Sequence, residues 1–144
     1  KFQTVDLKLL TKDVVALLQH DMKKSIITLK NEVQANFMQI DPELVEQVLI
    51  NLIKNAKEAV HGRVQGKIVV RSSTDAGRTL LSVIDNGSGI DAETLDNIFV
   101  PFFTTKKEGS GIGLSLSRQI MRAHKGDLIV QSQLDKGSEF SLVF

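Results

Sequence analysis

The stretch from Asp41 to Val60, DPELVEQVLINLIKNAKEAV, constrains the fold more than any other part of the chain. Asp41 is a preferred helix N-cap residue, Pro42 follows at the first helical position, and Glu43 favours the positive end of the helix dipole. Gly62 provides a stop, so the pattern predicts a helix from 41 to about 61. Its predicted buried stripe consists of Leu44, Val48, Leu49, Leu52, Ala56 and Ala59.

Periodic patterns on either side of this helix predict an α/β sandwich, that is, an α+β fold of two layers. Further helices are predicted at Asp6–His20, at 91–97 and over a stripe made of Ile112, Leu116, Ile120 and Ala123. Strands are predicted at 25–30, 35–40, 67–73, 79–85, 127–133 and 138–144. The first two and the last two of these strands are interpreted as hairpins because short polar turns join them. We therefore expect a mixed, largely antiparallel sheet covered on one face by about three helices.

The bulk composition is that of one soluble domain. The chain has 144 residues, of which 42% are hydrophobic and 24% charged, and this is enough for a single core. A net charge of +1 argues against nucleic acid or an acidic membrane as a partner, and the absence of cysteine excludes disulfides and a thiol nucleophile. The chain begins at Lys1 without methionine and stops at Phe144 in a strand-like run, so we expect a fragment of a longer protein.

Two asparagines, Asn51 and Asn55, lie one helical turn apart beside the predicted buried stripe. A buried amide is ordinarily paired with neighbouring polar groups, and that explanation stays open here. An amide oxygen in this place could instead bind Mg²⁺, which takes oxygen ligands and shares its coordination shell with substrate phosphates.

A glycine-rich segment, EGSGIGLSLSRQI, brings Gly109, Gly111 and Gly113 to the start of a predicted helix. A helix N-terminus of this kind binds phosphate through its backbone N–H groups, although a flexible helix entry would use the same residues. A dinucleotide-binding fingerprint would need glycine at Leu114, and GRVQGKI at 62–68 has the wrong spacing for a Walker A loop.

Three phenylalanines, Phe99, Phe102 and Phe103, come shortly before Lys106. Core packing is the ordinary explanation for such residues, and the alternative is that they anchor a lid that closes over phosphates.

None of the three histidines has the surroundings of a catalytic residue. His61 and His124 fall at predicted helix C-termini, where a cationic imidazole is favoured. His20 ends a helix without a supporting constellation of side chains.

Five motifs, taken in order, resemble the ATP-binding catalytic domain of bacterial sensor histidine kinases (the HATPase_c domain), in the GHKL superfamily that includes gyrase, heat-shock chaperone ATPases and MutL. They are NLIKNA for the asparagine box, DNGSGI for the first glycine box, FVPFFTTK for the phenylalanine box, GSGIGL for the second glycine box, and the tail GSEFSLVF. The resemblance runs over essentially the whole chain. The resemblance implies the Bergerat ATP-binding fold with a mobile ATP lid, and it implies Mg²⁺ and ATP as cofactors.

The resemblance also implies roles for individual residues. Asn55 would coordinate Mg²⁺, Asn51 would support the phosphates, and Lys106 would neutralise phosphate charge, so these three are the expected catalytic residues. Phe99, Phe102 and Phe103 would anchor the lid. The further nucleotide-binding residues that the resemblance implies are Ile90, Phe99, Phe103, Thr104, Thr105, Gly109, Ser110, Gly111, Ile112, Gly113 and Leu114.

The resemblance assigns base recognition to Asp85, with Gly87 and Gly89 leaving room for adenine. An ionised carboxylate only accepts hydrogen bonds, so it pairs with the exocyclic amine of adenine and repels the carbonyl that guanine presents at that place. ATP should therefore be preferred to GTP.

Position 51 distinguishes a kinase from its hydrolytic relatives. In those ATPases the corresponding motif resembles E-x-x-x-N-A, and its glutamate activates water. This chain has Asn51 at the place of that glutamate, and an amide cannot act as a base. Transfer to the neutral nitrogen of an imidazole needs alignment and charge neutralisation and no strong base. One departure is Glu58, where many histidine kinases carry a basic residue, and it leaves the roles of Lys54 and Lys57 open.

We therefore expect an ATP-dependent protein histidine kinase domain that phosphorylates a histidine on an upstream dimerisation hairpin and serves a response regulator. The fragment should be monomeric and its parent a homodimer in the cytoplasm, with or without an inner-membrane anchor, and without direct membrane or nucleic-acid contact by this domain. Two alternatives stay open: a stand-alone ATPase or anti-sigma-type serine kinase of the same superfamily, and a non-catalytic nucleotide-sensing module.

Overall fold

The computed structural model of the protein describes residues 1–22, 27–103 and 113–144. In chain order its elements are β1 (Gln3–Asp6), α1 (Leu7–Asp21), β2 (Thr28–Glu32), β3 (Phe37–Ile40), α2 (Pro42–Ala59), β4 (Lys67–Asp75), β5 (Arg78–Asp85), α3 (Ala92–Leu95), α4 (Gly113–Ala123), β6 (Asp127–Gln133) and β7 (Gly137–Val143).

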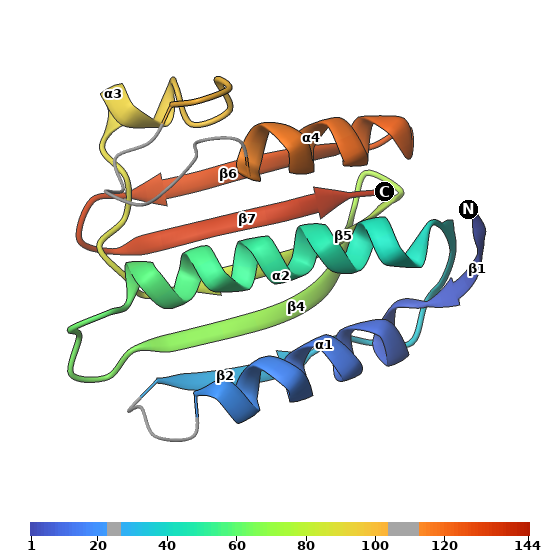
Figure 1. Ribbon diagram of the computed structural model, residues 1–144, viewed down its shortest axis with the longest axis horizontal. Helices are drawn as coiled ribbons and strands as arrows, with labels where there is room; N and C mark the ends of the chain where they lie inside the picture. The colour runs from blue at the N-terminus through green and yellow to red at the C-terminus, as the bar shows by residue number, and fades with distance from the viewer. Residues whose placement is uncertain (23–26, 104–112) are drawn as a thin grey trace.

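The main sheet has five strands in the order β2-β4-β5-β7-β6. Strands β2 and β4 are parallel, and the other neighbouring pairs are antiparallel. Figure 1 shows α1, α2 and α4 lying across one face of this sheet, with α2 between the other two. The predicted two-layer architecture and the mixed, largely antiparallel sheet are confirmed.

The predicted hairpin between 25–30 and 35–40 is wrong. β2 pairs with β4, and β3 pairs with β1 in a separate two-stranded sheet. The loop between β2 and β3 turns away because its polar groups bond to the start of α1: the Asn36 N–H donates to the Asp6 carboxylate and the Leu7 N–H donates to the Asn36 carbonyl. The parallel pairing of β2 with β4 then needs a crossover, which α2 supplies.

Helix α2 begins as predicted, with Asp41 as N-cap accepting a hydrogen bond from the Leu44 N–H. Its buried residues are Val45, Val48, Leu49, Leu52, Ile53 and Ala56. Leu44 and Ala59 are only partly buried, and the predicted stripe missed Val45 and Ile53. The difference arises because α2 packs against α1 and α4 as well as β5, so the buried arc is wider and rotated from that of a helix resting on a sheet alone.

Helix α4 and the hairpin of β6 and β7 complete the helical layer and the sheet. β6 and β7 pair antiparallel as predicted, from Asp127↔Val143 to Gln133↔Gly137. The residues that α4 buries are Ser117, Ile120 and Met121, whereas Leu116 and Ala123 of the predicted stripe are exposed, and Ile112 lies outside the described residues.

The short helix predicted at 91–97 is observed as α3, with Asp91 as its N-cap. Among the helices of the described residues, none is both long enough and apolar enough to cross a membrane.

Candidate functional site

Asn51 of α2 lies beside the first turns of α4. The Asn51 side-chain amide donates to the Ser117 hydroxyl at 3.3 Å. A Cβ built on Gly113 would lie 2.8 Å from Asn51 Oδ1, so the first residue of α4 touches the asparagine. Asn51 and Asn55 are both half-buried, and they are one turn apart as predicted. The fold thus brings the asparagine motif and the second glycine motif together.

Ser117 is a residue of this site that the sequence interpretation missed. It is 3% exposed on the buried face of α4, although a serine there contributes little apolar surface. Its hydroxyl instead pairs with Asn51, so the structural explanation of a paired amide holds for the Asn51 nitrogen. A polar residue at a core position of an amphipathic helix was the available signal.

Asn55 is the predicted ligand of Mg²⁺, and its side chain is half-buried on α2. Within the described residues no group of three or more histidines, cysteines or carboxylates is arranged to hold a metal. Mg²⁺ is commonly held by one or two protein oxygens together with substrate phosphates and water, and an amide oxygen of Asn55 is a ligand of that kind. The residues present therefore fit the predicted ion.

Asp85 ends the central strand β5 and is 7% exposed. One of its carboxylate oxygens accepts a hydrogen bond from the Gly87 N–H at 2.8 Å. Burial raises the pKa of Asp85, and the backbone N–H groups of Gly87 and Ser138, together with the charge of Arg63, partly oppose this rise. A buried acceptor oriented by two backbone donors is suited to recognising a ligand hydrogen-bond donor.

Gly87 and Gly89 are required by close packing of the loop that follows Asp85. A Cβ on Gly87 would lie 2.4 Å from the carbonyl oxygen of Ala59 at the end of α2, and a Cβ on Gly89 would lie 2.1 Å from the carbonyl oxygen of Gln133 at the end of β6. Gly89 also has φ +70°. These contacts give the glycines a role in the fold itself; that they leave room for a base stays a prediction.

Backbone hydrogen bonds fix this glycine loop, defined here as residues 86–90, from two sides. The Ser88 N–H donates to the Ala59 carbonyl at 3.0 Å, and the Ser88 carbonyl accepts from the Asp135 N–H at 2.7 Å. The Ile90 N–H donates to the Ser132 hydroxyl at 2.8 Å. The loop is thus held between the end of α2 and the turn that joins β6 to β7.

The phenylalanines that follow α3 have different environments. Phe99 packs against the core, and the guanidinium carbon of Arg118 lies 4.1 Å from the centre of its ring. Phe103 is half-buried. Phe102 is 78% exposed with φ +68°, so core packing does not explain it.

Part of the predicted site is not covered by the structure. Ile90 and Leu114 are described, and both are partly buried against the core. The predicted site residues outside the described residues are Thr104, Thr105, Lys106, Gly109, Ser110, Gly111 and Ile112.

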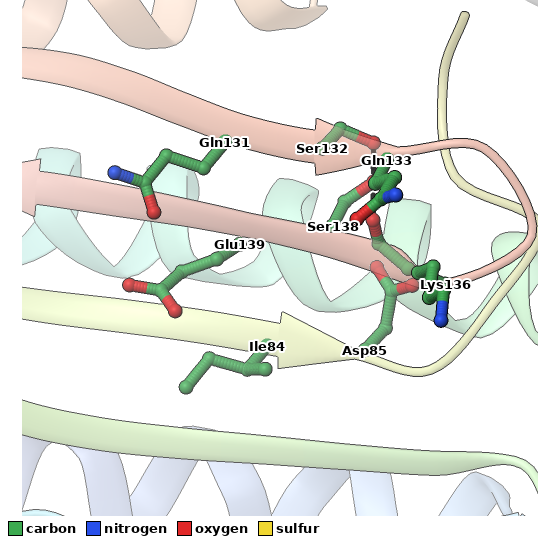
Figure 2. A pocket seen from close by; sticks show the side chains of 9 residues that line it. Ile84, Asp85, Gln131, Ser132, Gln133, Lys136, Ser138 and Glu139 are labelled. Atoms are coloured by element: carbon green, nitrogen blue, oxygen red, sulfur yellow. Dashed lines mark hydrogen bonds between the residues drawn. The ribbon is translucent and has the colours of Figure 1, made fainter.

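An open hollow of about 360 Å³ lies beside Asp85 at the ends of strands β5, β6 and β7 (Figure 2). Its lining includes Gln131 and Glu139, which the strand register places on the sheet face opposite to Asp85. Asn51 and Asn55 do not line it. The hollow therefore wraps around the strand ends and is not the space between α2 and α4 in which the phosphates are predicted.

His124 lies just past the end of α4, at the predicted helix C-terminus. Its Nε2 accepts a hydrogen bond from the Asp41 backbone N–H at 3.0 Å, and its Nδ1 lies 2.8 Å from the Ile120 carbonyl oxygen. The ring therefore connects the end of α4 to the start of α2.

Comparison with known proteins gives a consistent family. A family model described as histidine kinase-, DNA gyrase B-, and HSP90-like ATPase matches residues 40–144. Sensor histidine kinase ZraS of Escherichia coli (strain K12) is 39% identical over 142 residues, which are 97% of this chain and 30% of that protein. Sporulation kinase C of Bacillus subtilis (strain 168) is 34% identical over 145 residues, 99% of this chain and 33% of that protein. The chain therefore spans a third or less of the length of these relatives.

Solved structures agree with this assignment. The catalytic domain of histidine kinase ThkA matches with a TM-score of 0.87 at 32% identity, covering 100% of this chain and 95% of that chain. Histidine kinase ThkA in complex with response regulator protein TrrA matches with a TM-score of 0.82 at 30% identity, covering 99% of this chain and 41% of that chain. The fold is that of histidine kinase catalytic domains, and the chain belongs to the family of histidine kinase-, DNA gyrase B- and HSP90-like ATPases.

Proposed function

We propose that this domain binds Mg²⁺ and ATP and transfers the γ-phosphoryl group to a histidine of a separate helical hairpin in a longer chain. The observation that carries the proposal is that Asn51 of α2 touches Gly113, the first residue of α4. The strand β5, on which α2 packs, ends in the buried acceptor Asp85. The sensor histidine kinases among its relatives support the same reaction.

At the base end, Asp85 accepts a hydrogen bond from the exocyclic amine of adenine. The Gly87 N–H occupies only part of the acceptor capacity of the carboxylate, because its two oxygens together have about four lone-pair sites. The backbone donors also favour the ionised form that this recognition needs.

At the phosphate end, Asn55 would hold Mg²⁺ through its amide oxygen, and the ion would supply positive charge beside the phosphates. Asn51, whose amide is fixed by Ser117, contacts the phosphates from α2. The positive end of the α4 dipole at Gly113 faces the same space. Lys106 and the loop glycines Gly109 and Gly111 would add charge and backbone donors there.

The transfer itself needs no base from this domain. A bond forms between a ring nitrogen of the acceptor histidine and the γ-phosphorus, while the bond from that phosphorus to the β,γ-bridging oxygen breaks. ADP leaves, and the phosphorylated ring loses the proton of its other nitrogen to solvent. Asn51 is an amide and cannot activate water, which favours transfer over hydrolysis.

Partners follow from the same proposal. The phosphorylated histidine serves as donor for a response regulator, in line with the ThkA structure that contains response regulator protein TrrA. The longer chain would dimerise through the hairpin, and its catalytic domain would work in the cytoplasm, where ATP is available.

The experiment mixes the domain with ATP labelled at the γ-phosphate and with the hairpin of the longer chain, made as a separate protein. Label should appear on the hairpin histidine and should be absent when that histidine is replaced by glutamine. If ATP binds and the hairpin is never labelled, the kinase proposal fails. Rapid phosphate release by the domain alone would instead identify a hydrolytic ATPase.

A further inference from the structure

Two serine hydroxyls tie the glycine loop to the sheet beside Asp85. Ser132, near the end of β6, accepts from the Ile90 N–H at 2.8 Å. Its oxygen lies 2.7 Å from the Ser138 hydroxyl on β7, and it donates to the Gly137 carbonyl at 3.1 Å. Figure 2 shows both serines close to Asp85, where the three strands meet their connecting loops.

The hydrogen-bonding capacity of the Ser132 oxygen is completely used. A serine hydroxyl has one proton to donate and two lone pairs to accept with. The proton goes to Gly137, one lone pair receives the Ile90 N–H, and the other lone pair is left for the Ser138 hydroxyl. Ser138 is therefore the donor in the pair. We refer to Ser132, Ser138 and these bonds as the serine clasp.

The serine clasp joins the two segments that orient Asp85. The Gly87 N–H donates to the carboxylate at 2.8 Å, and Ser138 is the β7 residue that pairs with Asp85 in the strand register, where its backbone N–H helps to lower the pKa of that carboxyl. Gly87 belongs to the glycine loop, whose far end is held at Ile90 by Ser132, and Ser138 is held by the same hydroxyl. Loss of this one oxygen would remove the bonds that tie Ile90 and Ser138 to each other, while the bond from the Asp135 N–H to the Ser88 carbonyl would remain.

We propose that Ser132 is a positioning residue for base recognition, which acts through Asp85 by holding the two segments that supply the donors to its carboxylate. The inference rests on the proposed function, because it takes the adenine of ATP as the ligand of Asp85. The role is indirect because the Ser132 hydroxyl is occupied by protein groups.

Ser132→Thr and Ser132→Val form the matched pair of variants. Both are β-branched, suit a strand and add similar volume, and they differ in the hydroxyl alone. Ser141→Ala is the control for loss of a serine pair as such. Its hydroxyl lies 2.7 Å from that of Ser82, also buried between β5 and β7, and the register places this pair on the other face of the sheet from Asp85.

The measurement is the ratio of the dissociation constants of inosine triphosphate and ATP, because hypoxanthine has a carbonyl where adenine has its amine. Ser132→Val should lower this ratio by about tenfold, the scale of one hydrogen bond. In phosphoryl transfer by the full chain, KM for ATP should rise with kcat unchanged. Ser132→Thr and Ser141→Ala should keep the ratio of the unmodified protein.

Three results would overturn the inference. The first is an equal ratio for the valine and threonine variants. The second is an equal loss of affinity for ATP and inosine triphosphate in Ser132→Val, which would make the serine clasp a general support of the fold. The third is an unmodified protein that binds ATP without distinguishing the two bases, which would refute base recognition by Asp85 itself. Should Ser132→Val not fold, the same ratio is judged on Ser132→Ala.

Discussion

Gly89 and Gly77 offer a direct test of how tightly the glycine loop is packed. Both have positive φ, +70° at Gly89 and +79° at Gly77. A Cβ at Gly77 would meet nothing within 4 Å, whereas a Cβ at Gly89 would lie 2.1 Å from the Gln133 carbonyl oxygen. Alanine therefore imposes the same kind of backbone strain at both positions and a steric overlap at only one.

The expected magnitudes differ accordingly. Left-handed backbone costs an L-residue about 1–2 kcal/mol, and alanine regains about 0.4–1 kcal/mol by restricting the unfolded chain. Gly77→Ala should then lower the free energy of unfolding by about 1 kcal/mol or less. In Gly89→Ala the contact must also lengthen from 2.1 Å to at least 3.0 Å, which carries the neighbouring Ile90 N–H away from Ser132. We expect a total loss of about 3 kcal/mol or more.

The assay is urea unfolding of both variants and the unmodified protein at one temperature, followed by circular dichroism. The midpoint should shift strongly for Gly89→Ala and weakly for Gly77→Ala, with the slope against urea unchanged. Equal losses for the two variants would show that the loop and the end of β6 do not approach as described.

Three further predictions concern single side chains. The folded-state pKa of Asp85 is raised above its ordinary 3.8, so the folded protein binds the proton more tightly than the unfolded chain does. The contribution of this carboxyl to stability therefore falls as the pH rises from 3.8 through the folded-state pKa. Asp85→Asn should remove this pH dependence from the free energy of unfolding and should also weaken ATP binding. An unchanged pH dependence in the variant would contradict the assignment. Asn55→Ala should reduce the Mg²⁺-dependent gain in ATP affinity about tenfold or more, measured by calorimetry with and without a chelator; an unaltered gain would exclude Asn55 as ligand. Arg118→Met should cost about 1 kcal/mol of unfolding free energy through its contacts with Phe99 and Asp127, and Arg118→Lys should cost less because it keeps the charge; equal costs would mean that charge contributes nothing.

Elements with strong local signals were predictable from the sequence. Helix α2 carries its own start signal in Asp41 and Pro42, and the hairpin of β6 and β7 has a short turn between alternating strands. These features depend on nearby residues, so no knowledge of distant partners is needed to predict them.

Strand partners across the sheet were not predictable in the same way. Leu29 pairs with Ile68 in parallel strands that are far apart along the chain. No local pattern at 25–30 contains the information about that distant partner. Strand β1 was missed because it is short and pairs only with β3.

The candidate site shows the same division. The asparagines, Asp85 and the glycines could be named from motifs, whereas Ser132 and Ser138 gain their role only when β6 and β7 pair and bring their hydroxyls within 2.7 Å. The one local hint is that Ser132 lies on the same face of the strand as the apolar residues Leu128 and Val130.

The two bonds between α2 and α4 have a mechanical consequence. Near the start of α4, Asn51 bonds to Ser117; just past its end, His124 accepts from the N–H of Asp41, the N-cap of α2. The shorter helix, α4, is thus bonded to α2 near both of its ends. A misplacement of about 1 Å at a reacting group can cost roughly 100-fold in rate. A helix that is bonded to its neighbour near both ends moves less relative to that neighbour than a helix bonded at a single point. If ATP binds as we propose, its phosphate end would lie against a pair of helices that are fixed relative to each other.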